Sequence, residues 1–154
     1  MTESTIFEDN PLMNIESDYY QTIFDGRLCP SQKDLERKKR KGHPFDHMWE
    51  LFVYAAILGV SREKREPIVK AHKPFRWLNI GPAHQRNLLI LTIAKCGSFD
   101  IINNKEELKR AIEEYANGGI MIIDQEIKND PSAYSGLENL VYRILQELEP
   151  EAIV

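Results

Sequence analysis

The residues best placed to contact an anion form a basic run between positions 33 and 41. Its bases are Lys33, Arg37, Lys38, Lys39, Arg40 and Lys41, and with two acids the local charge is +4. A second cluster follows a hydrophobic segment and consists of Arg62, Lys64 and Arg65. Lysine and arginine at this density can neutralise several phosphates. Nucleic acid, an acidic protein partner and a solvated helix face are the alternatives that the run leaves open.

The acidic C-terminal part of the chain competes with the nucleic-acid interpretation. Residues 124–151 contain seven acids and two bases, and the whole chain has a net charge of −4. Proteins that coat nucleic acid without sequence preference are usually basic overall. The acidic end could instead pair with the basic run, within one chain or between two.

Two histidines four residues apart, His43 and His47, flank Asp46. Histidines at this spacing on one helix can share a metal ion. Pro44 lies between them at the start of a predicted helix, and neither a third ligand nor an HExxH pattern is close in the sequence. We therefore expect surface or capping roles, with no metal and no cofactor.

The two cysteines, Cys29 and Cys96, are far apart and have no CxxC neighbour, so reduced thiols are expected. The sequence contains no GxSxG, Walker or GxGxxG motif. Phe75 and Trp77 alternate with basic residues and could stack on a nucleobase, although core anchoring is the more ordinary role. These observations predict that the chain is not an enzyme.

Apolar spacing predicts that these candidates are carried by helices. The first expected helix begins at Ser31 and runs to Lys41. The others span Phe45–Leu58, Pro82–Lys95, the segment from Asn104 to Asn117-Gly118-Gly119, and Leu137–Leu148. Asn104 and Glu107 resemble a capping box, and the two glycines are read as a helix end. Ile120–Ile123 could begin a further helix or form a short strand, and a helix is favoured. The segment between Ser61 and Ile80 is read as a long connection, with a short extended piece at Pro67–Lys70.

The predicted fold is therefore all-α, a compact bundle of about five or six helices around a hairpin of the second and third expected helices. Residues 1–30 are expected to form an extended N-terminal arm with one short helix at Ser17–Phe24, and residues 31–154 a single helical domain. The N-terminus lacks the pattern of a signal peptide, and the most apolar windows are too short to cross a bilayer. A cytoplasmic location is expected.

The segment from His43 to Ile127 resembles the Dnd system-associated protein 4 family, small proteins linked to bacterial DNA phosphorothioation. The resemblance is carried by the apolar helix Phe52–Gly59, the charged segment Arg65–Pro67 and the run Glu113–Gly119. It implies an antiviral defence setting, in which sulfur replaces a non-bridging phosphate oxygen of DNA or unmarked DNA is restricted. The matched patterns concern helix packing, so no functional residue follows from them.

Three hypotheses follow. The first is a non-catalytic accessory subunit of a modification or restriction system, which contacts other proteins of that system, or a second copy of itself, through the C-terminal helix and the N-terminal arm. The second is a DNA-binding module that uses the two basic clusters. The third is a small enzyme with a histidine-based site supported by Cys96 or Asp46.

Overall fold

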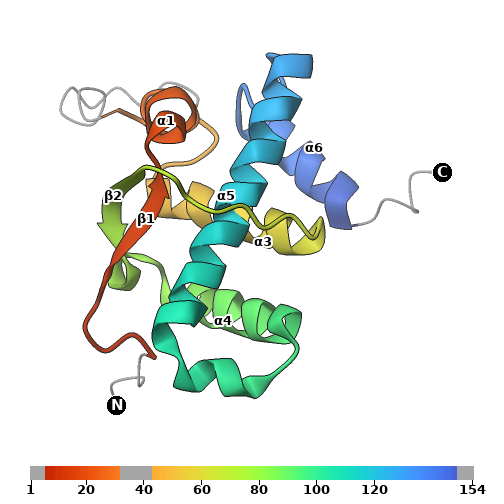
Figure 1. The fold of residues 1–154 in the computed structure, drawn as a ribbon. Helices are drawn as coiled ribbons and strands as arrows, with labels where there is room; N and C mark the ends of the chain where they lie inside the picture. The colour runs from red at the N-terminus through yellow and green to blue at the C-terminus, as the bar shows by residue number, and fades with distance from the viewer. Residues whose placement is uncertain (1–5, 32–42, 149–154) are drawn as a thin grey trace.

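The structure, a computed structural model, describes residues 6–31 and 43–148 (Figure 1). In chain order its elements are β1 (Leu12–Glu16), α1 (Ser17–Tyr19), the π-helical turn η1 (Tyr20–Phe24), α3 (Met48–Ser61), β2 (Ala71–Arg76), the 3₁₀ turn η2 (Trp77–Asn79), α4 (Pro82–Cys96), the 3₁₀ turn η3 (Phe99–Asn103), α5 (Lys105–Asn129) and α6 (Leu137–Leu148). The helix predicted for residues 31–41 falls almost wholly outside the described residues.

The long helix α5 is the centre of the fold, and α3 crosses it (Figure 1). The crossing is close because glycines replace side chains where the two backbones meet. A Cβ atom on Gly59 would lie 1.9 Å from the Tyr115 carbonyl oxygen. Just beyond the end of α3, a Cβ atom on Gly118 would lie 2.0 Å from the Lys64 carbonyl oxygen. Only residues without a side chain allow backbones to approach this closely.

This crossing corrects two predicted helix ends and the predicted centre of the bundle. Gly59 and the pair Gly118-Gly119 were expected to end helices, but each lies inside one, and α5 continues to Asn129. Glycine at these sites serves helix packing rather than termination. The main partner of α3 is α5, not α4.

Other helix limits follow local capping rules. The Asn104 side chain accepts a hydrogen bond from the Glu107 N–H at 3.2 Å, which confirms the predicted start of α5. Helix α4 begins at Pro82 and ends before Gly97, whose φ of 79° is left-handed. Helix α3 begins three residues later than predicted, because His47 is extended and donates its N–H to the Glu50 carboxylate at 3.0 Å.

The described residues also contain a small antiparallel sheet, so the fold is mostly helical rather than all-α. Strands β1 and β2 pair from Leu12↔Arg76 to Glu16↔Ala71. Two residues of β2, Lys73 and Pro74, stand opposite the single residue Asn14. This is a β-bulge, placed where Pro74 could not have donated a ladder hydrogen bond. The extended piece predicted at Pro67–Lys70 lies just before the observed strand.

Residues 6–31 pack on the helices instead of forming an extended arm. The chain from Ser17 to Phe24 is helical as predicted, and it follows β1 directly. The apolar side chains of this region are buried in the same core as those of α3 and α5, and they are Phe7, Met13, Ile15, Ile23, Phe24, Leu28 and Cys29. Their number exceeds what a solvated segment would carry, and burial of this apolar area stabilises the docked position.

Phe75 and Trp77 anchor the connection between α3 and α4, as predicted. Trp77 is fully buried and meets Phe7 edge to face, with ring centroids 4.9 Å apart. Phe75 is also buried, so neither ring is available to stack on a nucleobase. None of the helices in the described ranges is long and apolar enough to cross a membrane.

Candidate functional site

The predicted basic residues divide between described and undescribed parts of the chain. Lys33 and the run from Arg37 to Lys41 lie outside the described residues, so their role stays a prediction. Arg62, Lys64 and Arg65 lie at and after the end of α3. Lys64 forms an ion pair with Glu66 at 3.2 Å.

Arg65 is partly buried, and its guanidinium is bonded to side chains of α5. Its Nε and Nη2 atoms donate to Glu114 at 2.7 Å and Glu107 at 2.9 Å, and its guanidinium lies 5.7 Å from the Tyr115 ring centroid. These bonds favour the charged form and raise the pKa of Arg65 against the opposing effect of burial. Two carboxylates already balance its charge, which reduces what Arg65 could offer a phosphate.

The same connection is held to α5 and β1 by further polar contacts. The Asn117 side chain donates to the carbonyl groups of Glu66 and Pro67, at 3.3 and 3.2 Å. The Glu16 carboxylate accepts the N–H groups of Val69 and Lys70. Residues 62–70 therefore lie in a fixed position along the central helix.

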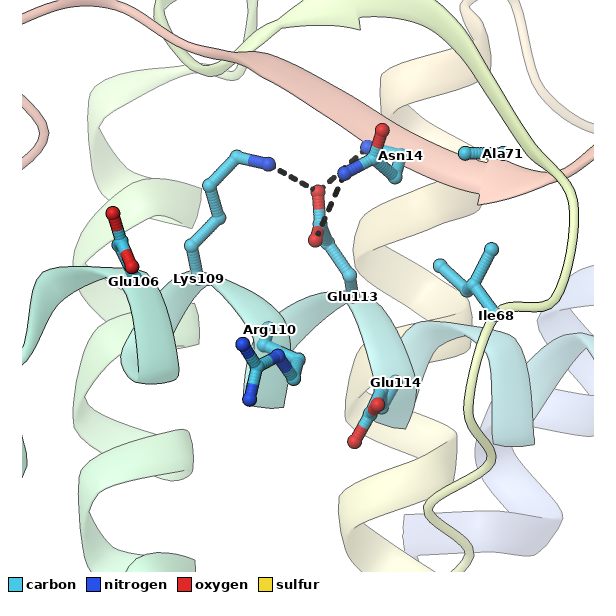
Figure 2. Close-up of a pocket in the computed structure, with 8 residues that line it drawn as sticks. All are labelled: Asn14, Ile68, Ala71, Glu106, Lys109, Arg110, Glu113 and Glu114. Atoms are coloured by element: carbon cyan, nitrogen blue, oxygen red, sulfur yellow. Dashed lines mark hydrogen bonds and ion pairs between the residues drawn. The ribbon is translucent and has the colours of Figure 1, made fainter.

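A polar pocket of about 390 Å³ opens between α5 and the β1–β2 sheet (Figure 2). Its lining residues are Asn14, Ile68, Ala71, Glu106, Lys109, Arg110, Glu113 and Glu114. Glu113 is only 5% exposed, and a buried carboxylate in a pocket is a candidate for acid–base chemistry. Whether Glu113 is available for such chemistry depends on the hydrogen bonds and ion pairs that its carboxylate already forms.

The Glu113 carboxylate is occupied by structural contacts (Figure 2). One oxygen accepts the Asn14 backbone N–H at 2.6 Å and the Lys109 ammonium at 2.7 Å, and the other accepts the Asn14 side-chain amide at 3.3 Å. Pro11 and Ser17, at the two ends of β1, form backbone hydrogen bonds toward β2. Because the hydrogen-bonding direction alternates from one residue to the next along a strand, the even-numbered Asn14 points its N–H away from β2. Glu113 therefore closes the outer edge of β1 against α5.

A second polar pocket, of about 360 Å³, lies where α3, α5 and α6 meet. Arg62 and Arg143 both line it, together with Glu126. Arg143 donates to Glu126 at 2.5 Å, which ties α6 to α5. Tyr134 also donates to Glu126 at 3.2 Å, and burial raises the pKa of Tyr134.

The largest of these hollows is apolar and lies between α4 and η3. It has a volume of about 460 Å³ and is lined by Ile90, Ile93, Ala94, Gly97, Ser98 and Phe99. Phe99 is 79% exposed and Ile90 is 64% exposed. Exposed apolar side chains gathered around a hollow are typical of a protein contact surface. We call this surface the α4–η3 groove.

A second apolar surface is the outer face of α6. Leu140 is buried, and Ile144 is partly buried against the core. Val141, Tyr142 and Leu145 lie on the other side of the helix and are 46%, 58% and 53% exposed. We call these three residues the α6 outer face.

The histidine and cysteine candidates are dispersed. His47 stacks near Trp49 at the start of α3, with ring centroids 5.9 Å apart, whereas Cys96 is the last residue of α4. Cys29 is buried, its thiol donates to the His47 carbonyl at 3.7 Å, and desolvation raises the pKa of that thiol. Across residues 6–31 and 43–148, no group of three or more metal-ligating side chains is placed to hold an ion.

Sequence reasoning missed the polar pocket and the α4–η3 groove. Asn14 and Glu113 are 99 residues apart, and no local pattern connects them. The sequence places this helix at the centre of the predicted bundle, whereas the structure leaves Ile90 on its outer side 64% exposed.

Within residues 6–31 and 43–148, the molecule is thus mostly helical, with structural polar pockets and two exposed apolar surfaces. The model of the family described as DNA sulphur modification system-associated protein 4 matches residues 31–152, so the chain belongs to that family. The match extends beyond the resembling segment to include α6. No curated protein and no solved structure matches the chain.

Proposed function

We propose that this chain is a non-catalytic accessory subunit of a DNA sulphur modification system, which acts by binding other proteins of that system. Membership of the family supports the association with such a system. The observation that carries the proposed mode of action is the α6 outer face. An amphipathic helix with its apolar side only half used by its own core is a common docking element.

The geometry of α6 suits a docking role. Arg143 bonds to Glu126 and Leu140 is buried, so the helix is fixed on one side. The α6 outer face is thereby presented on a rigid support, which lowers the entropy cost of binding. A partner would offer an apolar groove, into which Val141 and Leu145 insert.

The polar pockets support a non-catalytic role. Glu113 is bonded to Asn14 and Lys109, and Arg65 is bonded to two glutamates. The Asn14–Glu113 contact and the two Arg65 contacts join separate parts of the fold, and the Lys109–Glu113 pair lies within α5. Groups that already have internal partners are less available for proton transfer or substrate binding.

The test is reconstitution of the full chain with the purified proteins of a DNA sulphur modification system. Binding is measured by sedimentation and by capture of one component on another. Leu145→Asp should weaken the complex at least tenfold, since a buried interface charge without a partner costs more than about 1.4 kcal/mol. Val69→Asp is the control. Val69 is 90% exposed, and it lies in the 62–70 connection, far from α6 in the sequence. The proposal would be refuted if the unmodified chain bound no component. It would also be refuted if the Leu145→Asp variant bound as tightly as the unmodified chain.

Duplex DNA binding is the second candidate, and the pocket shared by Arg62 and Arg143 favours it. Arg62 and Arg143 both line this pocket, and Arg143 is paired there with Glu126 and more distantly with Asp130. Fluorescence anisotropy with plain and phosphorothioated duplexes at two salt concentrations tests this role. Binding through phosphate contacts would weaken steeply as salt rises and would fall on Arg62→Glu substitution. Equal anisotropy with and without the protein would exclude it.

A further inference from the structure

The outer side of α4 carries a stripe of residues at the spacing found where two helices pair. We call this stripe the seam. Its members are all exposed and are Ala83, Asn87, Ile90, Ala94 and Gly97. The intervals of four, three, four and three residues are those of the a and d positions in a coiled coil. The opposite side of the helix is used by the core, where Leu88 and Thr92 are buried. The seam therefore faces away from the molecule.

The seam contains both a projection and the hollow that would receive it. Ile90 projects from the helix, with 64% of its surface exposed. One and two turns further along, Ala94 and Gly97 leave the α4–η3 groove open beside Phe99. A twofold axis through the midpoint between Ile90 and Ala94 would set Ile90 of each copy into the groove of the other. Such self-complementarity is what a twofold symmetric interface requires.

The distribution of charge favours the same arrangement. Helix α4 contains Arg86 and Lys95 but no aspartate or glutamate, and Lys95 is already paired with Glu63. Asp100 follows the helix in η3. An antiparallel pair about the stated axis places position 86 of one copy opposite position 98 of the other, beside Asp100. A parallel pair would instead place Arg86 against Arg86.

We propose that the α4–η3 groove is the contact surface between two copies of this chain, with the two α4 helices antiparallel. Ile90 fills the partner's groove, Phe99 covers its edge, and Arg86 faces Asp100 of the second copy. Antiparallel alignment also opposes the two helix dipoles favourably. This inference concerns a different surface from the α6 outer face and does not depend on the function proposed above.

Sedimentation velocity of the full chain, from about 1 to 100 µM, tests the pairing over the affinity range expected for a small interface. The unmodified chain should shift from monomer to dimer mass within this range. Ile90→Glu should weaken the dimer at least tenfold. Ala94→Arg fills the groove from an exposed helical site and should have the same effect, so a folding defect in either variant does not decide the result. Circular dichroism confirms that each variant is folded.

Two comparisons make the test specific. Leu145→Asp, in the α6 outer face, should leave the dimer unchanged, whereas loss of the dimer in this variant would assign the pairing to α6 and overturn the proposal. Arg86→Glu should weaken the dimer, and the double variant Arg86→Glu/Asp100→Arg should restore it. Because Arg86 also interacts within its own chain, this restoration is the decisive comparison for the antiparallel arrangement. A monomer at all concentrations, or a dimer indifferent to both Ile90→Glu and Ala94→Arg, would also overturn the proposal.

Discussion

Gly119 lies so close to Ala55 that a Cβ atom on Gly119 would be 1.8 Å from the Ala55 carbonyl oxygen. Helices α5 and α3 are therefore in backbone contact at the centre of the molecule. Neither backbone can move aside without disturbing the buried side chains on both helices. The crossing is the contact on which the positions of the other elements depend.

Gly119→Ala should destabilise the fold by about 1–3 kcal/mol, because the added methyl group forces two packed backbones apart. This loss exceeds the gain of roughly 1 kcal/mol that alanine brings to a helix interior. Urea unfolding followed by circular dichroism measures the difference. Gly81→Ala is the matched control, since its Cβ would meet no atom closer than 3.4 Å and its φ of −57° suits alanine. Equal stabilities of the two variants would refute the close crossing.

Glu113→Ala should cost about 1–3 kcal/mol, because the part-buried Asn14 N–H would lose its acceptor. Glu113→Gln keeps one acceptor oxygen and should cost less. Glu106→Gln, at an exposed site in the same pocket, should leave the free energy of unfolding unchanged within about 0.5 kcal/mol. Should Glu106→Gln and Glu113→Ala prove equally destabilising, the edge-closing role of Glu113 would be wrong.

The two thiols should differ in reactivity. Cys29 is fully buried and desolvation raises the pKa of its thiol, whereas Cys96 is partly exposed. Since thiolate is the reactive form, a disulfide reagent near pH 8 should modify Cys96 quickly and Cys29 only after unfolding. Mass spectrometry of native and denatured protein counts the modified sites. Rapid double modification of the native chain would contradict the burial of Cys29.

Arg65→Ala should loosen residues 62–70 and destabilise the protein by about 1 kcal/mol, a figure discounted because Arg65 is about a third exposed. Faster amide hydrogen exchange in the connection is the measurement. Lys64→Ala removes a charge one residue earlier that pairs only locally with Glu66, and its effect should be smaller. Identical exchange in the two variants would show that the glutamates do not hold the connection through Arg65.

Stability should fall at acid pH partly through Asp130. Hydrogen bonds from the Ser132 hydroxyl and N–H lower the pKa of Asp130 below the usual aspartate value. A lowered folded-state pKa adds stability that is complete above the unfolded-state pKa and is lost as pH falls through the folded-state value, here below about pH 4. Ser132→Ala should move the Asp130 pKa upward in an NMR titration. An unchanged titration would remove Ser132 as the cause.

Local rules predicted the helix limits that depend on local chemistry. The Pro82 start of α4, its Gly97 end and the Asn104 cap of α5 all follow from residues within one turn. Gly59 and Gly119 were misread because their role is set by a helix distant in sequence. Strand β2 was missed for the same reason, since its partner β1 lies more than 50 residues earlier along the chain.

The candidate surfaces were predictable only in part. The amphipathic stripe of α6 indicated a helix with one apolar side, but only the structure separates the buried Leu140 from the exposed Leu145. Charge density drew attention to Arg65, and its carboxylate partners on α5 could not be inferred from spacing. The basic run from Lys33 to Lys41 lies outside the described residues and stays a prediction.

Helix α5 is 25 residues long, which corresponds to about 37 Å. Helix α4 and η3, which line the groove, lie near its beginning, and α6 lies beside its end (Figure 1). A protein bound at α6 would therefore leave α4 uncovered. Two copies joined at α4 would carry two separate α6 sites on one particle, and a partner with repeated binding sites would be retained by avidity rather than by the strength of either contact alone.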